Sequence, residues 1–304
     1  MLPKEPKLCW QKQRTPRPLR GSSYGITRLA VKLLAIDIDG TLLDSGGSIP
    51  EANRKALECA RQRGVVIVLV TGRRFHTAAP IARELNLDSP VVAYNGALIR
   101  HALTGKVLYH QPLLPEAAAA AAAVILEHRV DPLLHFALDG PEGRATVGLF
   151  IDPDGDWMRK WVRRNRELVD FAPDLIHAVI RRPTCLTAGA SPDRASRLVC
   201  DLRERLANLR VFETHYPDQN RIFIDVLHPD CSKAEAVAKI AKDLGISPSE
   251  VMAVGDNHND LPLLEAVGTP VVMGNAPESL KQLGFHVTDS NDDAGLAKAI
   301  NAFL

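Results

Sequence analysis

Short apolar runs, separated by segments with helical spacing, are the feature that most constrains the fold of this chain. Residues Val31–Asp37 (VKLLAID), Val65–Val70 (VVIVLV) and Val91–Tyr94 have the length of strands and are apolar enough to be buried on both faces. Between the first two, the segment that Pro50 opens repeats alanine every fourth residue until Gly64, which predicts a helix. Strand, helix and strand at this spacing predict parallel β-α-β units.

The pattern changes in the middle of the chain and returns near its end. Between residues 98 and 220 the apolar runs are shorter and more polar, and helical stretches such as Ala117–Leu126 lie between them. We expect strands there at Val107–His110, Leu133–Leu138, Val147–Ile151 and His177–Ile180. The buried style then resumes, with expected strands at Ile222–Val226, Val251–Gly255 and Pro270–Met273 and expected helices at Ser232–Leu244, at Asn259–Val267 and from about Asp292.

This order predicts one α/β domain built from both ends of the chain, with a second module inserted into it. We expect a doubly wound, mostly parallel, Rossmann-like core sheet from residues 31–97 and 221–304. Residues 98–220 are the inserted α+β module in this prediction. The length of 304 residues agrees, because a domain takes roughly 150 residues.

Charge is balanced over the whole chain but uneven along it. The formal net charge is +1, yet residues 1–32 carry eight basic side chains and one acidic side chain, for a net of +7. The rest of the chain therefore has a net charge of −6. Four prolines and no periodicity predict a disordered basic tail over residues 1–30; a targeting peptide is the alternative, although the tail has no apolar h-region.

Two further properties bear on partners and location. The near-zero net charge and the lack of a stretch of roughly 18 apolar residues point to neither a nucleic-acid nor a membrane partner. The five cysteines are widely spaced and form no C-x-x-C pair, which favours a reducing compartment and, we expect, the cytoplasm. Nothing in the sequence indicates the oligomeric state.

Polar residues follow the predicted core strands, at the sheet edge where open α/β folds bind their ligands. The run Asp37-Ile38-Asp39-Gly40-Thr41 follows the first strand, Thr71-Gly72-Arg73 follows the second, and Gly255-Asp256-Asn257-His258-Asn259-Asp260 follows the strand at Val251. Lys233 lies at the start of the helix after the insertion. These segments should therefore meet at one edge of the core sheet.

The chemistry of these side chains points to phosphoryl transfer. Four carboxylates (Asp37, Asp39, Asp256 and Asp260) would repel one another unless a hard divalent cation such as Mg²⁺ neutralised them. Lys233, the Thr71 hydroxyl and backbone N–H groups would complete a phosphate pocket. One carboxylate of the Asp37/Asp39 pair can act as a nucleophile while the other exchanges protons with the leaving group and with water.

Each motif also has an ordinary structural interpretation. An isolated Asp-x-Asp-Gly is usually a turn, Thr71 could simply cap a helix, and Lys233 could be a solvated helix lysine. The basic stretch Arg159–Arg166 (RKWVRRNR) could be a nucleic-acid patch, but a solvated helix face is the better interpretation. What favours function is that the motifs fall together at strand ends.

The same residues resemble the four motifs of the haloacid dehalogenase-like hydrolases, in the order DIDGTLL, VTGR, lysine and GDNHND. The match is most similar to the Cof-type phosphatase branch, whose cap is inserted between the second and third motifs. The segments YNGALI (Tyr94–Ile99) and VVMGNAPES (Val271–Ser279) also resemble that branch. The resemblance runs from about Val31 to the C-terminus and departs at Ser232-Lys233-Ala234, where glycine commonly follows the lysine.

This resemblance implies a role for each matching residue. Asp37 would be the nucleophile and Asp39 the general acid/base. Mg²⁺ would be held by Asp37, Asp256 and the Asp39 backbone carbonyl, and Asp260 would orient the shell of ligands around the metal. The resemblance also implies phosphate binding by Thr71, Gly72, Lys233 and Asn259, and a place near the substrate entrance for Asn95 and Gly96.

The sequence therefore predicts a magnesium-dependent phosphatase that acts on small phosphorylated metabolites through an aspartyl-phosphate intermediate. Sugar phosphates are favoured by the resemblance alone. Two alternatives stay open, namely a phosphosugar mutase and a catalytically silent regulatory protein that binds a phosphorylated ligand. Substrate selectivity should depend on the inserted module, which covers the site.

Overall fold

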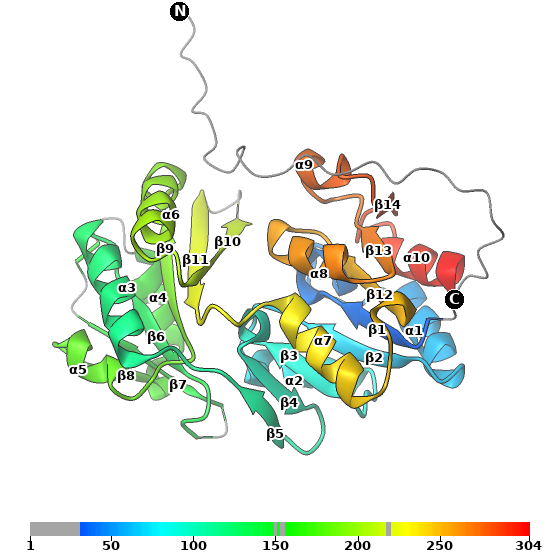
Figure 1. The fold of residues 1–304 in the computed structure, drawn as a ribbon, viewed down its shortest axis with the longest axis horizontal. Helices are drawn as coiled ribbons and strands as arrows, with labels where there is room; N and C mark the ends of the chain where they lie inside the picture. The colour runs from blue at the N-terminus through cyan, green and yellow to red at the C-terminus, as the bar shows by residue number, and fades with distance from the viewer. Residues whose placement is uncertain (1–30, 141, 149–150, 153–155, 217–219) are drawn as a thin grey trace, which may run out of the picture.

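The described part of the chain forms two sheets, each covered by helices and lying side by side (Figure 1). The computed structural model describes residues 31–140, 142–148, 151–152, 156–216 and 220–304. The predicted tail, residues 1–30, lies outside the described residues. Within the described part, no helix is long and apolar enough to cross a bilayer.

The larger sheet has the strand order β14-β13-β12-β1-β2-β3-β4-β5. Its strands are β1 (Leu33–Ile36), β2 (Val66–Val70), β3 (Pro90–Ala93), β4 (Leu98–His101), β5 (Val107–His110), β12 (Val251–Gly255), β13 (Thr269–Val272) and β14 (His286–Val287). Neighbours from β14 to β3 pair in parallel, and β4 and β5 add an antiparallel edge. The predicted α/β fold class is thus confirmed.

Helices bury both faces of this larger sheet. One face is covered by α1 (Glu51–Gln62), α2 (Phe75–Glu84) and α10 (Gly295–Phe303). The other face is covered by α7 (Lys233–Asp243), α8 (Leu261–Ala266) and α9 (Glu278–Lys281). In β1, Leu34 and Ile36 contact the first group, while Leu33 and Ala35 contact the second. This two-residue alternation explains why the strand is apolar throughout.

The smaller sheet has the strand order β10-β11-β9-β6-β7-β8. Its strands are β6 (Leu133–Phe136), β7 (Arg144–Val147), β8 (Val169–Phe171), β9 (Cys185–Ala190), β10 (Arg210–Tyr216) and β11 (Arg221–Leu227). On one face lie α3 (Pro115–Glu127), α5 (Leu175–Val179) and α6 (Pro192–Arg205). On the other face, α4 (Asp156–Arg164) buries Met158 and Val162 over β6, β7 and β8.

Sheet membership differs from the prediction at both ends of the insertion. Residues 98–110, expected in the inserted module, form β4 and β5 of the larger sheet, because the short turn after β3 returns the chain antiparallel to it. Strand β11, expected at Ile222–Val226 in the core, pairs antiparallel with β9 and β10 in the smaller sheet. We therefore propose that the inserted module lies between β5 and α7.

Two strands expected inside the insertion are also different. The segment expected as a strand at His177–Ile180 is helical up to Val179, because Leu175, Ala178 and Val179 recur at helical spacing and pack beneath α3. The expected strand Val147–Ile151 is replaced by β7, which ends at Val147; residues 149–150 lie outside the described part. The alanine-rich stretch is helical, as predicted, within α3.

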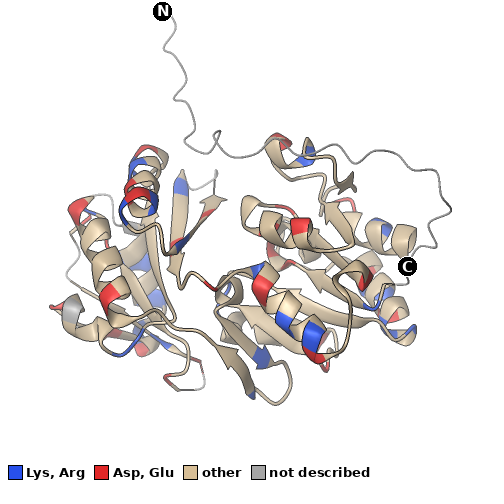
Figure 2. Ribbon diagram, viewed as in Figure 1, with Lys and Arg blue, Asp and Glu red and all other residues tan. Residues whose placement is uncertain are grey.

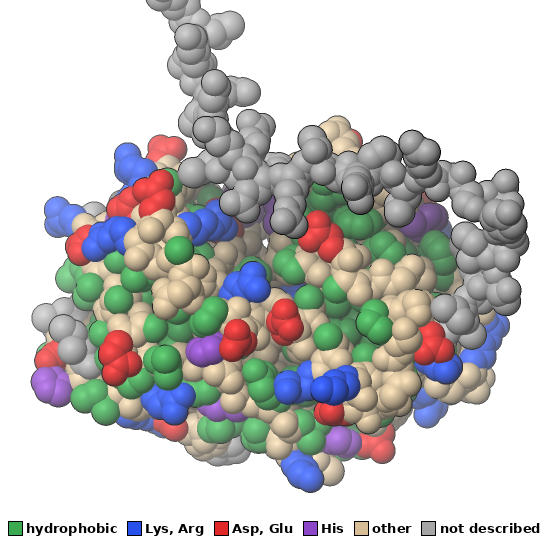
Figure 3. All heavy atoms as spheres, in the orientation of Figure 1, with side chains coloured by type: hydrophobic (Ala, Val, Ile, Leu, Met, Phe, Trp, Pro, Cys, Tyr) green, Lys and Arg blue, Asp and Glu red, His purple; other side chains and the backbone are tan. Residues whose placement is uncertain are grey.

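In Figure 2, Lys and Arg are interspersed with Asp and Glu over both halves of the described ribbon. On the face drawn in Figure 3, hydrophobic side chains are likewise scattered among charged ones. The basic stretch in α4 exposes Arg163 and Arg164 and turns Met158 and Val162 inward, as expected for a solvated helix face.

Candidate active site

The carboxyl ends of β1, β2 and β12 meet at one edge of the larger sheet. Asp37 follows β1, Thr71 follows β2 and Asp256 follows β12. They line a cavity of about 460 Å³ that also includes residues of the smaller sheet and α4. These positions confirm the prediction that the motifs meet at one edge of the core sheet.

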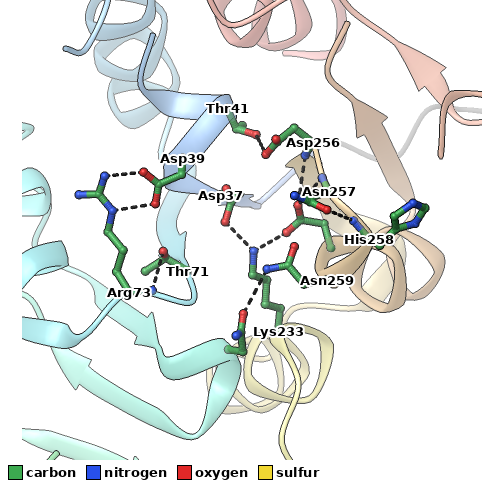
Figure 4. A network of polar contacts seen from close by, with 12 residues as sticks. Asp37, Asp39, Thr41, Thr71, Arg73, Lys233, Asp256, Asn257, His258 and Asn259 are labelled. Atoms are coloured by element: carbon green, nitrogen blue, oxygen red, sulfur yellow. Dashed lines mark hydrogen bonds and ion pairs between the residues drawn. The ribbon is translucent and has the colours of Figure 1, made fainter. Parts of the chain in front are cut away.

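Lys233 is the centre of the buried polar cluster (Figure 4). Its Nζ donates to Oδ1 of Asp37 and to Oδ1 of Asp260, both at 2.5 Å, and the residue is only 1% exposed. The Ser232 side chain caps the start of α7 by accepting from the backbone N–H of Glu235 at 3.1 Å. A cation this deeply buried requires paired carboxylates, so Lys233 is not a solvated helix lysine.

A third carboxylate, Asp256, adjoins this pair. Thr41 Oγ1 donates to Asp256 Oδ1 at 3.2 Å. Asp260 Oδ2 accepts from the backbone N–H groups of Asp256 at 3.1 Å and Asn257 at 3.0 Å, which ties the loop after β12 to the cluster. Oxygens of Asp37, Asp256 and Asp260 lie within 4.8 Å of one another.

The cluster is short of positive charge. Burial raises the pKa of Asp37 to about 7, although Lys233 opposes the shift. Burial and the charge of Asp37 raise the pKa of Asp256 well above its usual value. Burial lowers the pKa of Lys233, but Asp260 and Asp37 outweigh it and raise that pKa above its ordinary value. Three crowded oxygen donors with a deficit of positive charge fit a hard divalent cation.

Two glycines allow this crowding. Gly40 has φ +74°, and a Cβ there would lie 2.4 Å from Oδ2 of Asp256. A Cβ at Gly255 would lie 2.5 Å from Cγ of Asp260. Any larger residue at either position would push a carboxylate out of the cluster.

Asp39 lies beside the cluster but has a different partner. Arg73 binds it with two bonds, from Nε to Oδ2 at 2.7 Å and from Nη2 to Oδ1. This hydrogen bonding raises the pKa of Arg73, and the Asp39 side chain is 52% exposed. Sequence reasoning assigned no role to Arg73, although it directly follows Thr71-Gly72.

Asn95 and Gly96 were expected near the substrate entrance, but the structure places them elsewhere. Both are buried, Asn95 to 1% exposure, and neither lines the cavity. Gly96 approaches the start of α7 so closely that a Cβ would lie 2.2 Å from the carbonyl oxygen of Ser232. The turn at Tyr94–Gly96 therefore packs against the start of α7, which carries Lys233, and does not form an entrance for substrate.

Asn95 instead links the core loops to the smaller sheet. Asn259 Nδ2 donates to Asn95 Oδ1 at 3.2 Å, and Asn95 Nδ2 donates to Asp225 Oδ2 at 3.0 Å. Thr187 Oγ1 donates to the other oxygen of Asp225 at 2.7 Å. Burial raises the pKa of Asp225 to about 6, against the hydrogen bonds from Thr187 and Asn95.

Three of the four predicted phosphate-binding residues lie where a ligand could reach them, and Lys233 does not. Thr71, Gly72 and Asn259 line the cavity. Thr71 Oγ1 accepts from the backbone N–H of Arg73 at 3.1 Å, so its own hydroxyl proton is left to point elsewhere. Lys233 does not line the cavity and lies beneath Asp37.

Sequence reasoning missed the cavity wall contributed by the inserted module. This wall includes Trp157, Trp161, Thr187, Phe223 and Asp225. The one signal available was the alternation in β11, where Phe223 and Asp225 are two residues apart between buried aliphatic residues. Nothing in the sequence indicated which side of that strand would face the core.

Most of this chain is similar to proteins of one known family. The model of the haloacid dehalogenase-like hydrolases matches residues 34–300. YxeH of Bacillus subtilis (strain 168) is 32% identical over 281 residues, covering 90% of this chain and 98% of YxeH. The 5-amino-6-(5-phospho-D-ribitylamino)uracil phosphatase YcsE of the same strain is 28% identical, covering 90% and 96%. The solved structure of BT1666 from Bacteroides thetaiotaomicron, analysed among haloalkanoate-superfamily phosphatases, is 26% identical with a TM-score of 0.74, covering 94% and 99%.

Proposed function

Because this chain belongs to the haloacid dehalogenase-like hydrolases and is a phosphatase of that family, we propose that it hydrolyses small phosphorylated metabolites through a phosphorylated Asp37. The observation that carries the proposal is the buried cluster of Asp37, Lys233, Asp256 and Asp260 opening beside Asp39. Sugar phosphates are the first substrates to test, since the sequence resemblance favours them.

The proposed reaction has two steps. In the first, an oxygen of Asp37 attacks phosphorus, the bond to the ester oxygen breaks, and that oxygen takes a proton from Asp39. In the second, water attacks the aspartyl phosphate while the Asp39 carboxylate accepts its proton, which releases phosphate and regenerates Asp37. Thr71, Gly72 and Asn259 would bind the phosphoryl oxygens, and Lys233 would balance the charge of Asp37.

The pair formed by Asp39 and Arg73 bears on both steps. In the structure the Arg73 guanidinium forms an ion pair with the Asp39 carboxyl group, which is the proposed acid and base. Donation of a proton in the first step therefore requires this ion pair to open when substrate arrives. Arg73 would then be free to contact the negatively charged phosphate ester.

Asp37, Asp256 and the backbone carbonyl of Asp39 would hold Mg²⁺, with Asp260 fixing the loop that carries Asp256. Bound Mg²⁺ would supply positive charge against the transferring phosphoryl group. Dialysis against EDTA should abolish phosphate release, and added Mg²⁺ should restore it. Full activity in metal-free enzyme would contradict this part of the proposal.

Purified protein assayed for free phosphate on a panel of phosphate esters, with Mg²⁺, tests the reaction class. A mutase would instead yield a phosphorylated isomer without net release of phosphate. A silent regulatory protein would bind phosphorylated ligands at micromolar concentration without turnover. The accessible acid/base candidate Asp39 favours hydrolysis over the silent alternative.

The proposed partner is the small phosphorylated substrate alone. We also propose a cytoplasmic location, which rests on the cysteine spacing; Cys59, Cys185 and Cys231 are free thiols in the structure.

A further inference from the structure

The strands β9 and β11 of the inserted module each present two different faces. Leu186, Ala188, Ile224 and Val226 join the hydrophobic cluster beneath the module's helices. The intervening Thr187, Phe223 and Asp225 line the cavity above the catalytic cluster. One face of this sheet is therefore structural, while the other contacts whatever is bound.

Four aromatic rings lie on that cavity face, beside Leu133, His135, Thr187, Thr214, His215 and Asp225. Trp157 meets Phe223 edge to face at 4.8 Å between ring centroids and 87°, and Phe223 meets Tyr216 at 5.2 Å and 86°. Trp161 lines the cavity from the next turn of α4. We call Trp157, Trp161, Tyr216 and Phe223 the aromatic wall.

The wall is held in place by specific contacts. Trp157 Nε1 donates to the carbonyl oxygen of Gly189 at 3.0 Å. A Cβ at Gly189 would lie 2.5 Å from Cζ2 of Trp157, so the indole requires glycine at this position in β9. Because these contacts order the rings before a ligand arrives, binding a ligand against them costs little side-chain entropy.

The acidic group beside the wall already has its partners. Both oxygens of Asp225 accept hydrogen bonds, from Thr187 and from Asn95. A sugar presents several hydroxyls, and each would need a polar partner when buried. Four rings grouped on one side of the cavity offer a flat, apolar ring more contact area than a polyhydroxylated ring can use.

We propose that the group esterified to the phosphate is a planar aromatic or heteroaromatic ring, which packs against the aromatic wall while the phosphate lies at Asp37. This inference rests on the proposed function and narrows its substrate class. Phe223, which contacts both Trp157 and Tyr216, is the specificity-determining residue at the centre of the wall.

The test compares three esters in the full-length, magnesium-loaded enzyme: benzyl phosphate, cyclohexylmethyl phosphate and glucose 6-phosphate. The first two differ mainly in the flatness of the ring. We expect kcat/KM for benzyl phosphate to exceed both others, by about 3- to 10-fold over cyclohexylmethyl phosphate, the range that aromatic contacts contribute. Equal values, or a preference for glucose 6-phosphate, would overturn the inference.

Variants separate the wall from intrinsic differences between the esters. Phe223→Leu keeps apolar volume but removes the central ring, so the benzyl-to-cyclohexylmethyl ratio should fall toward 1. Phe171→Leu is the matched control, because Phe171 is 62% exposed on β8 and lies outside the cavity. A folded Phe223→Leu protein that keeps the wild-type ratio would refute the role of the wall.

One measurement needs neither a folded variant nor turnover. Benzylphosphonate and cyclohexylmethylphosphonate cannot be hydrolysed, and their binding to wild-type enzyme can be followed by calorimetry. Tighter binding of the benzyl compound supports the aromatic wall, and equal binding opposes it. Absence of phosphate release from every ester would instead refute the proposed function, so the two failures are distinguishable.

Discussion

The two sheets use their residues in opposite ways. In the larger sheet the central strands β1 and β12 are buried along their whole length, and the polar groups follow the strand ends in short loops. In the smaller sheet the groups that face the cavity lie within strands β9 and β11 and on helix α4. The comparison teaches that the groups proposed to react are positioned by loop backbone. The surface proposed to contact the rest of the substrate is positioned by the alternation of side chains on a sheet.

The sharpest way to break this comparison is to remove the nucleophile. Asp37→Asn should lower kcat by at least about 10³-fold, because an amide cannot form the acyl phosphate. Steady-state phosphate release measures the loss, and circular dichroism checks the fold. Near-normal turnover in this variant would mean that the larger sheet does not carry the chemistry as proposed.

The next test changes the charge beneath the nucleophile. Lys233→Met leaves Asp37 and Asp260 buried without their cation, so the free energy of unfolding should fall by about 3–5 kcal/mol. Urea denaturation measures the change. Lys239→Met, on the same helix but exposed, is the control and should cost far less. Equal effects of the two substitutions would contradict a special role for Lys233.

A smaller effect should come from the smaller sheet through Asp225. Its pKa is raised from 3.8 to about 6, so the native state binds this proton more tightly than the unfolded state. The contribution of Asp225 to stability is therefore greatest below about pH 4 and declines as the pH rises through about 6. In Asp225→Asn that part of the pH dependence should vanish.

Denaturant midpoints between pH 4 and 7, compared for the wild type and Asp225→Asn, isolate this effect from that of Asp37, which is present in both proteins. The substitution itself should cost about 1 kcal/mol, because Asn95 loses one acceptor. Parallel pH curves for the two proteins would rule out the assigned titration.

The smallest expected effect concerns neither sheet. Deleting residues 1–30 should leave kcat/KM within about twofold, since the catalytic and aromatic groups all lie between Asp37 and Asp260. The assay is phosphate release by the shortened protein. A large loss would show that the basic tail takes part in substrate binding.

The same contrast explains how much the sequence could predict. The meeting of Asp37, Lys233, Asp256 and Asp260 was predictable, because strand-end motifs are local and their order shows which loops meet. The sequence could not predict which sheet Leu98–His101 and Arg221–Leu227 would join. Each pairs antiparallel with a neighbouring strand, and nothing in the segment itself indicates which strand that is. The aromatic wall was equally hidden, since the facing of Phe223 depends on packing by α6 and α3.

Asn95 shows a third kind of limit. The resemblance of its segment, YNGALI, to the Cof-type branch implied a place near the substrate entrance. The structure instead shows its amide hydrogen-bonded to Asn259 and to Asp225. Such a role depends on two distant loops that approach only after folding.

The position of β1 between β2 and β12 also orders events during synthesis. β1 emerges early, but its partner Val251–Gly255 follows only after the whole smaller sheet has been made. The smaller sheet spans one continuous stretch, from Leu133 to Leu227, and can close while the larger one is still incomplete. On the ribosome, the substrate-facing module can thus be assembled before the site that it serves.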